Sequence, residues 1–238
     1  TLMKNEWISS VVQEYVDTGN FLICGPVKLA GRKNYFEKLQ SIEFFGLIGI
    51  GAAGISAHRP MFCNGANLAF SRKIFNEVNG YEKSLSFSGD DTQLMLKINQ
   101  LYPGKISFLK DTRAIVETNV LSDKPDLWQQ RKRWASKIPY TLSSFTIFIA
   151  VVAWLVHAFL LIQVFNALFH SAFLLLFLSL TIKISAEIFF LKSAGKFFGE
   201  KIPSWIVISA QPLYCIYIVC IGLLAPFGTF QWKGRSVR

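Results

Sequence analysis

One long stretch without charged side chains constrains the fold more than any other feature of the sequence. From Ile138 to Ile182 there is no Asp, Glu, Lys or Arg. Because about 20 apolar residues cross the hydrocarbon core of a bilayer, this stretch predicts two membrane crossings. We place them at about residues 143–164 and 170–191, with the turn at Asn166–His170.

A third membrane helix is predicted at about residues 205–226. It lies in another charge-free run, Ile202–Trp232, and has Pro212 in its interior. Proline either kinks a membrane helix or breaks it into a re-entrant pair, and the sequence leaves both alternatives open. The second crossing contains Lys183 and Glu187, an i,i+4 pair on one helix face that can neutralise itself or meet a polar partner.

Basic residues beside these helices predict their orientation. They precede the first crossing and follow the second: Arg131, Lys132, Arg133 and Lys137, then Lys192, Lys196 and Lys201. Basic flanks stay in the cytoplasm, so we expect a multi-pass protein of the cell (inner) membrane whose first part, up to residue 142, is cytoplasmic. The basic tail at 227–238 obeys this rule if the Pro212 segment does not cross, and is an exception to it if the segment does.

The first 142 residues differ from the rest in charge. They contain 18 basic and 13 acidic residues, whereas residues 143–238 contain 7 and 2. We therefore predict a globular domain at 1–142 and a membrane region at 143–226. Apolar runs and turn residues predict strands at 21–27, 67–70, 106–109 and 114–117, and helices at 36–48, 72–78, 94–98 and 126–137. This order indicates an α/β or α+β domain followed by a membrane anchor.

The predicted helix at 36–48 becomes strongly apolar toward its end. Two interpretations are open for it, because such a segment can lie on a membrane surface or form a buried core helix. The glycines that follow predict that the helix does not continue: Gly46, Gly49, Gly51 and Gly54.

Two adjacent carboxylates, Asp90 and Asp91, follow Gly89 just before a helical pattern. One interpretation is helix capping, because Asp90 with Gln93 three residues later matches a capping box. The other is catalytic, because a carboxylate held at a turn can accept a proton from a substrate hydroxyl as a general base.

A second candidate group lies on the helix predicted at 126–137. Gln130, Arg133 and Trp134 are spaced i, i+3 and i+4 and therefore share a face. Arginine offers a planar fork of donors for phosphate oxygens, and tryptophan a flat surface on which a sugar ring can stack. The alternative is a basic cluster that anchors the chain to anionic lipid.

A third candidate is the turn Asn-Gly-Ala-Asn at 64–67. Such a turn usually serves backbone geometry, since Gly and Asn accept positive φ, but it can also line a site. The four cysteines and three histidines lack the spacing of metal ligands. We therefore expect reduced thiols and no metal ligands in this chain.

These three motifs, in this order and followed by membrane helices, resemble family 2 glycosyltransferases. The resemblance covers most of the chain. It implies a GT-A catalytic domain, a nucleotide-sugar donor, and inverting transfer to a hydroxyl of a lipid or a growing polysaccharide. The roles that it implies are the general base for Asp91 with Asp90 before it, donor diphosphate binding for Gln130 and Arg133, and acceptor binding for Trp134, Asn67 and Gly65.

The resemblance further implies an Asp-x-Asp motif that holds a divalent cation, Mg²⁺ or Mn²⁺, on the donor diphosphate of the complete enzyme. No Asp-x-Asp occurs in this sequence. We therefore interpret the chain as a carboxyl-terminal portion, an incomplete GT-A-like domain followed by a transmembrane helical region. The segment Gln231–Arg235 is similar to the ending of membrane members that glycosylate lipids.

Two other classes of protein were weighed against this one. A non-catalytic membrane transporter or scaffold would use Asp90 as a cap and residues 131–133 as a lipid anchor, and charges such as Lys183 and Glu187 inside a span often mark a pathway. Nucleic-acid binding is suggested by the pI of about 9.5. The basic residues are mostly beside the membrane and are not interleaved with exposed aromatics, so no nucleic-acid partner is expected.

Overall fold

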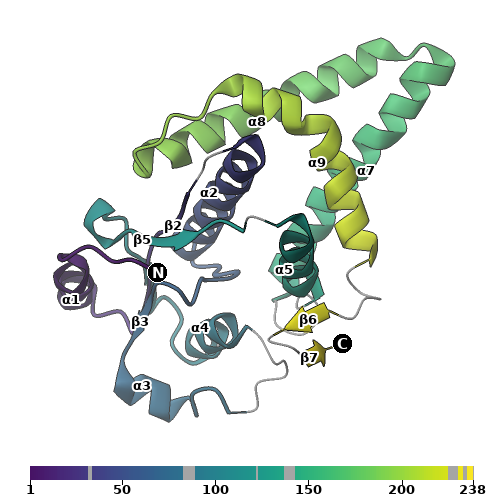
Figure 1. Ribbon diagram of the computed structural model, residues 1–238. Coiled ribbons are helices and arrows are strands. Elements are labelled where there is room, and N and C mark those ends of the chain that lie inside the picture. Colours follow the sequence, from purple (N-terminus) through teal and green to yellow (C-terminus); the bar gives the residue numbers. More distant parts are fainter. Residues whose placement is uncertain are drawn as a thin grey trace. The chain divides into compact units, whose positions relative to one another are not determined.

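The computed structural model describes residues 1–31, 34–82, 89–121, 123–136, 143–224, 230–232 and 235–237 (Figure 1). Contacts divide the chain into two units, and each is described by itself. The first unit comprises residues 1–122 and 140–145, and the second comprises residues 123–139 and 146–238. Lys137 and much of the predicted tail at 227–238 lie outside the described residues.

A mixed sheet forms the centre of the first unit. Its middle strand, β1 (Leu22–Cys24), pairs in parallel with β4 (Ile106–Phe108) and antiparallel with β3 (Leu68–Phe70). The strands β3 and β4 were predicted to within one residue, whereas β1 ends three residues before the predicted end at 27. The helix before β4 is α4 (Asp90–Leu101). The parallel pairing of β1 with β4 therefore places the chain near residue 22 close to the carboxyl-terminal end of α4.

The strand predicted at 21–27 is in fact interrupted. After β1 the chain passes through Gly25 and Pro26 and continues as β2 (Val27–Ala30), which pairs in parallel with β5 (Val116–Asn119). Proline lacks the N–H that a continuous ladder would need. The strand predicted at 114–117 begins two residues later, at Val116. The reason is that residues 112–114 form the 3-10 helix η1 (Thr112–Ala114).

The two faces of β1 are covered by different helices. Leu22 and Cys24 point to one face, where they pack with apolar residues of α3 (Arg72–Glu77) and α4 (Asp90–Leu101). Ile23 points to the opposite face and packs near Trp7 and Val11 of α1 (Trp7–Thr18). This alternation is the ordinary period of a strand, and it places the beginning of α4 beside the sheet.

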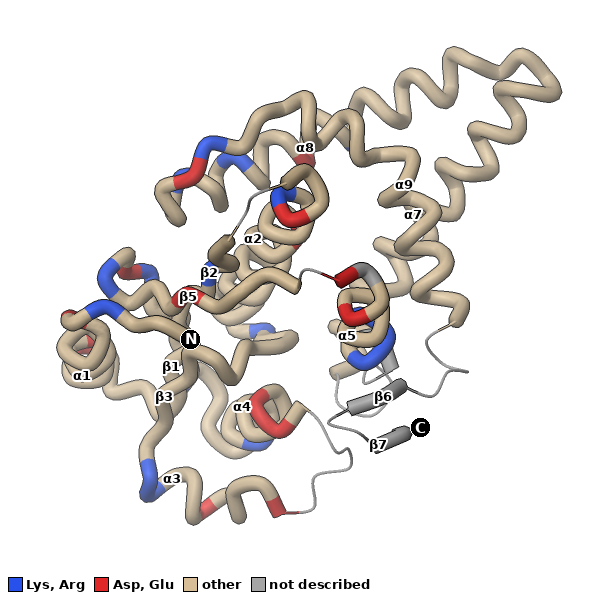
Figure 2. Tube along the Cα trace, in the orientation of Figure 1, with Lys and Arg blue, Asp and Glu red and all other residues tan. Residues whose placement is uncertain are grey.

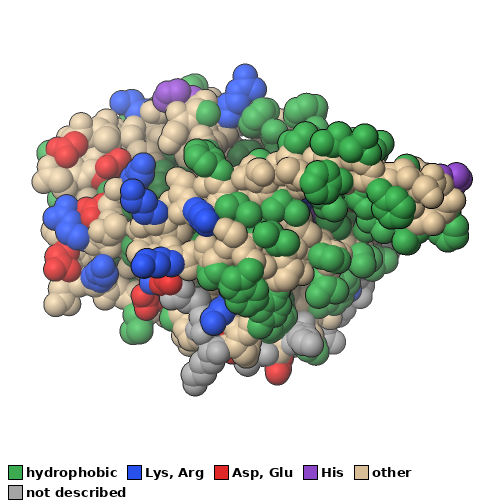
Figure 3. Space-filling view, turned by 90° about the horizontal axis from the view of Figure 1, so that it is seen from above, with side chains coloured by type: hydrophobic (Ala, Val, Ile, Leu, Met, Phe, Trp, Pro, Cys, Tyr) green, Lys and Arg blue, Asp and Glu red, His purple; other side chains and the backbone are tan. Residues whose placement is uncertain are grey.

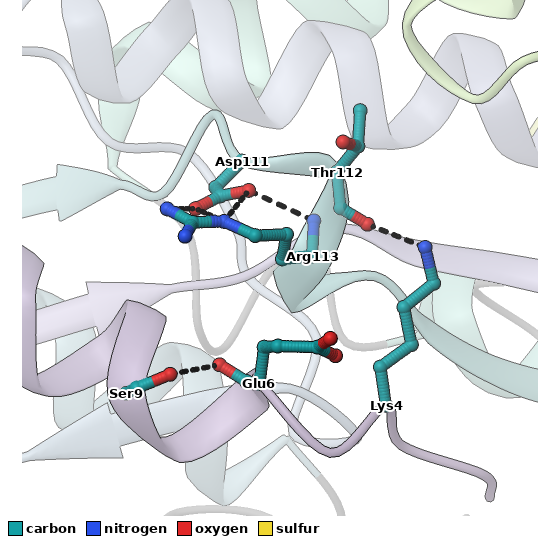
Figure 4. Close-up of polar contacts among 6 residues, drawn as sticks. All are labelled: Lys4, Glu6, Ser9, Asp111, Thr112 and Arg113. Carbon is teal, nitrogen blue, oxygen red and sulfur yellow. Dashed lines mark hydrogen bonds and ion pairs between the residues drawn. The ribbon is translucent and has the colours of Figure 1, made fainter.

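Polar contacts fix the segment around α1 to the loop that precedes β5 (Figure 4). Lys4 Nζ donates to the carbonyl oxygen of Thr112 at 3.1 Å. In the same loop Arg113 donates to Asp111, with Nη2 2.8 Å from Oδ2, and these hydrogen bonds lower the pKa of the Asp111 carboxyl. The loop is therefore joined to the segment before α1 by Lys4 and is stabilised internally by the Arg113–Asp111 pair.

The helix predicted to end near residue 48 runs on as α2 (Tyr35–Ser56), so the prediction that the glycines end it is wrong. Two of the four glycines are in close contact with the chain that follows the helix, and a Cβ on Gly51 would lie 3.3 Å from the carbonyl oxygen of Phe62. A Cβ on Gly54 would lie 2.9 Å from the carbonyl oxygen of Arg59. Because α2 contacts β2 and β4, its packing favours the core-helix interpretation over the membrane-surface one.

The second unit contains the motif helix α5 (Lys124–Ser136) and three long apolar helices, α7 (Ser144–His170), α8 (Phe173–Phe197) and α9 (Ser204–Leu224). At 1.5 Å per residue each of the three spans about 30 Å or more, the thickness of the hydrocarbon core. Charged residues are nearly absent from α7 and α9 (Figure 2), and hydrophobic side chains gather on the exposed surface, many from α7 and α8 (Figure 3). By length and composition α2 also qualifies as a span.

The turn between the first two long helices lies later than predicted. The helix α7 continues through Asn166 to His170, and the reversal occurs at Ser171, whose φ is +55°. An aromatic pair stabilises the extra turn of helix, because the rings of Phe165 and Phe169 lie 4.4 Å apart at i,i+4. The polar Asn166 therefore does not mark the end of the helix.

The second and third long helices also correct the predicted bounds. The helix α8 continues past residue 191 to Phe197, so Lys192 and Lys196 end the apolar stretch without ending the helix. The described part of the third segment is one helix, with Pro212 inside it. The structure thus excludes a break at Pro212, which was one of the two alternatives for this segment.

Candidate active site

The candidate catalytic carboxylate, Asp91, is half-buried at the first turn of α4. Its Oδ1 accepts a hydrogen bond from the backbone N–H of Thr92 at 2.8 Å, and its Oδ2 accepts one from the backbone N–H of Gly65 at 2.7 Å. Each carboxylate oxygen is thereby fixed by one donor and keeps further acceptor capacity. The side chain has a fixed direction and can still receive a proton.

The capping interpretation of Asp90 is wrong. The N-cap residue of α4 is Gly89, in the left-handed conformation with φ of +106°. Asp90 is the first residue of the helix and is exposed, whereas Asp91 is the carboxylate that meets a backbone N–H of the first turn. Both acids lie in the first turn of the helix.

The hydrogen bond between Gly65 and Asp91 joins two motifs that are 26 residues apart in the chain. The turn 64–67 therefore lines the carboxylate, as one interpretation of the sequence expected. Space at Gly65 is limited, since a Cβ there would lie 3.1 Å from Asp91 Oδ2. The turn is exposed at Gly65, and Asp91 itself is half-buried.

Replacing Gly65 by Ala tests how closely the turn controls the carboxylate. The added methyl group should displace the Asp91 carboxylate by a few tenths of an ångström. Because small misplacements of a reacting group are costly, we expect kcat of the complete enzyme to fall by about tenfold, with the thermal unfolding temperature nearly unchanged. A Gly65→Ala enzyme with full kcat would show that the carboxylate position does not matter.

Asn67 lies in the same turn, but its side chain has a structural role, because it joins separate segments of the first unit. Its side chain is 2% exposed. Its Nδ2 donates to the carbonyl oxygens of Pro26 and Ala114, both at 2.8 Å, and its Oδ1 accepts from Trp7 Nε1 at 2.9 Å. All of its hydrogen-bonding groups are therefore engaged inside the protein. This geometry gives no support to the acceptor-binding role implied by the resemblance.

Two residues near the carboxylates were not singled out from the sequence. Burial raises the pKa of the Tyr81 hydroxyl, and the negative charges of Asp90 and Asp91 raise it further. The Cys24 thiol, burial and the charge of Asp91 raise the pKa of Cys63 well above its ordinary value. Tyr81 belongs to no motif and Cys63 directly precedes the turn 64–67, and only the fold shows that both lie within electrostatic reach of Asp91.

The raised pKa of Cys63 predicts slow alkylation. Only the thiolate reacts, so a higher pKa means a smaller reactive fraction at any pH below it. We expect the rate of iodoacetamide labelling at Cys63 to reach half its maximum at a higher pH in the folded protein than in urea, as measured by mass spectrometry. In the Asp91→Asn variant this midpoint should move to lower pH, because one negative charge is gone. Equal midpoints in folded and unfolded protein would contradict the assignment.

The second candidate group is confirmed to share one helix. Gln130, Arg133 and Trp134 all lie on α5, and each side chain is half-buried. The structure adds Arg131, which is 5% exposed. Its Nη1 donates to Gln130 Oε1 at 2.7 Å, and its guanidinium carbon lies 4.2 Å from the centre of the Trp134 ring. The helix α5 itself packs against α9.

The charged pair of the second long helix forms a closed polar ring with α9. Lys183 Nζ donates to Glu187 Oε1 and to Gln211 Oε1, each at 2.6 Å, and Gln211 Nε2 donates to Glu187 Oε2 at 2.6 Å. The polar partner that the sequence left open is thus Gln211. Because the charges satisfy one another, this pair gives little support to the transporter interpretation.

The described residues offer no cation site. Nowhere in these ranges do three or more His, Cys, Asp or Glu side chains gather in a way that could hold a metal ion. The described residues therefore do not by themselves form a site for the divalent cation that the resemblance implies for the complete enzyme.

Comparison with known proteins identifies the family. A family model described as "Glycosyl transferase family group 2" matches residues 1–228. No curated protein and no solved structure matches the chain. The matched range includes Gly65, Asp91 and the motif helix α5 as well as all three long apolar helices. The chain therefore belongs to glycosyltransferase family group 2.

Proposed function

We propose that this chain is the carboxyl-terminal, membrane-anchored portion of an inverting glycosyltransferase. The enzyme transfers a sugar from a nucleotide-diphosphate donor to a hydroxyl of a lipid or a growing polysaccharide, with Asp91 as the general base. The observation that carries the proposal is the Asp91 carboxylate, held by the N–H groups of Gly65 and Thr92 beside an exposed turn. It is found in a chain whose family transfers sugars.

The proposed reaction is a single displacement at the anomeric carbon. An oxygen of the Asp91 carboxylate takes the proton of the acceptor hydroxyl, and the acceptor oxygen forms a bond to the anomeric carbon. The bond from that carbon to the diphosphate breaks on the opposite face, so the configuration inverts. Because Asp91 begins the reaction ionised and already oriented, little reorganisation is needed when the acceptor arrives.

The leaving diphosphate requires positive charge and hydrogen-bond donors. Negative charge develops on it as the sugar departs, so donors that meet it stabilise the transition state more than the ground state. We assign this role to Gln130 and Arg133 on α5, and the border of the acceptor site to Trp134. Gly65 would meet the acceptor beside Asp91. A divalent cation remains part of the proposal for the complete enzyme.

A lipid acceptor is favoured by the position of the motif helix. The helix α5 packs against α9, one of the helices long and apolar enough to cross a membrane, so Trp134 belongs to an element that is attached to the membrane region. A growing polysaccharide that reaches the membrane would contact the same helix, α5. We propose that the catalytic part faces the cytoplasm of the inner membrane, as the basic residues before α7 and after α8 suggest.

Sugar transfer by the complete membrane protein tests the proposal. Membranes that contain it would be incubated with radiolabelled UDP- and GDP-sugars and with lipid extracts. We expect label in a lipid or polymer fraction with at least one donor, and NMR of the product should show the anomeric configuration opposite to that of the donor. Retention of configuration would exclude the single displacement, and failure with every donor and acceptor would contradict the proposed activity.

A further inference from the structure

The residue on α5 that the motif leaves unassigned is the most buried of the group. Arg131 is 5% exposed, while Gln130, Arg133 and Trp134 are half-buried. Burying a guanidinium is costly unless hydrogen bonds and packing compensate for lost water. Two contacts of Arg131 are with members of the motif, a hydrogen bond to Gln130 and ring stacking on Trp134. Arg131 can therefore orient the side chains of both Gln130 and Trp134.

The contact with Gln130 decides which end of the amide faces away from Arg131. A guanidinium has only donors, so it can bind the amide oxygen and not the amide nitrogen. With Oε1 held 2.7 Å from Arg131 Nη1, the Gln130 NH₂ group is the end that remains for another partner. An NH₂ group donates hydrogen bonds, which is the chemistry that the oxygens of a diphosphate require.

The contact with Trp134 fixes the plane of the indole. The guanidinium carbon lies 4.2 Å from the ring centre, well within the distance of a cation–π interaction. It occupies one face of the ring, so a sugar can stack only on the other face. One buried side chain therefore orients both a donor for the diphosphate and a stacking surface for the acceptor.

We propose that Arg131 is a positioning residue, which holds the Gln130 amide with its NH₂ group toward the donor diphosphate and fixes the plane of Trp134. This inference rests on the proposed function, because it assumes that Gln130 binds the donor. Arg131 acts through its neighbours and does not itself touch the substrate. Arg133 remains the arginine assigned to the diphosphate.

A double-mutant cycle tests whether Arg131 works through Gln130. In the complete enzyme in membranes, the donor KM would be measured for the wild type, Arg131→Met, Gln130→Ala and the double variant, with whichever UDP- or GDP-sugar the wild type uses. If Arg131 orients Gln130, the Arg131→Met change should raise the donor KM by about tenfold in the wild-type background, the scale of one hydrogen bond to a charged group. It should raise the KM by less than about twofold once Gln130 is Ala.

The same cycle distinguishes positioning from a merely structural role. A structural arginine would raise the KM by the same factor in both backgrounds, and that result would overturn the inference. The matched control is Lys132→Met, which removes one charge from the neighbouring position on α5 but neither of the contacts of Arg131. We expect it to change the donor KM by less than about twofold, and an effect as large as that of Arg131→Met would also overturn the inference.

A second variant keeps the test decisive if Arg131→Met does not fold. Arg131→Lys retains the charge and one donor for Gln130 Oε1 but loses the planar fork. Its donor KM should lie between those of the wild type and Gln130→Ala, again only when Gln130 is present. A wild-type enzyme that transfers no sugar from any donor contradicts the proposed function, whereas an active wild type with additive effects contradicts only the role of Arg131.

Discussion

Replacing Asp91 by Asn should abolish most sugar transfer by the complete enzyme. General base catalysis contributes about 10² to 10⁴ in rate, and Asn cannot accept a proton under these conditions. The change is nearly isosteric, but the amide nitrogen of Asn cannot accept, so only one of the hydrogen bonds from the N–H groups of Gly65 and Thr92 is kept. Donor binding should be affected much less than transfer, because we assign the donor diphosphate to residues of α5. Initial rates of transfer, together with the affinity for the nucleoside diphosphate alone, would separate lost catalysis from lost binding.

Asp90→Asn is the matched comparison for this experiment. Asp90 is exposed, and Asp91 is the acid that holds the N–H groups of Gly65 and Thr92. We therefore expect Asp90→Asn to reduce transfer much less than Asp91→Asn. Undiminished transfer by the Asp91 variant, or equal losses in the two variants, would remove Asp91 from the role of base.

The local elements of the first unit were predicted well because their signals are local. Strands β1, β3 and β4 are short apolar runs between turn residues, and the helix α3 follows one of them directly. The order of β1, β3, α3 and β4 could thus be predicted from the sequence, whereas α1 and β2 were not predicted. The pairing could not, because β1 lies between β3 and β4, which come from distant parts of the chain.

The wrong predictions share one physical cause, since in each a residue's intrinsic preference is overruled by its surroundings. Glycines inside α2 remain helical because Gly54 has no Cβ to collide with the carbonyl of Arg59. Asp90 does not cap α4, because Gly89 takes the left-handed conformation at the cap. Asn166 does not end α7, because the next turn of helix is stabilised by an aromatic pair. The intrinsic preference of one residue is a weak guide wherever its neighbours along the chain decide the local conformation.

The candidate site shows the same division between sequence and fold. The spacing of Gln130, Arg133 and Trp134 is a helical period, so their common face could be predicted from the sequence. The bond from Gly65 to Asp91 and the contacts of Arg131 could not, because the first joins distant segments and the second depends on side-chain direction. Asn67 illustrates the opposite case, in which a motif residue turns out to be buried inside the frame of the domain.

Breaking the polar ring between α8 and α9 should destabilise the membrane region strongly. In the Glu187→Leu variant the ammonium group of Lys183 keeps Gln211 as a partner but loses its counter-charge. The side chain of Lys183 is only 10% exposed. Removing one partner of a buried ion pair costs about 3–5 kcal/mol. We expect a loss of this size in the free energy of unfolding, measured by denaturant titration of the chain in detergent micelles with tryptophan fluorescence.

The triple variant Lys183→Leu, Glu187→Leu, Gln211→Leu should recover most of that loss. It leaves no charge or amide between α8 and α9, and replacing a buried polar network by apolar side chains is often neutral or stabilising. Lys192→Leu, an exposed lysine on the same helix, should change stability by less than about 0.5 kcal/mol. If the single variant were as stable as the wild type, the ring would not hold α8 to α9. If the triple variant were less stable than Glu187→Leu, the loss would come from packing and not from an uncompensated charge. The expected order therefore identifies the unpaired ammonium, and not the missing side chain, as the cause of the instability.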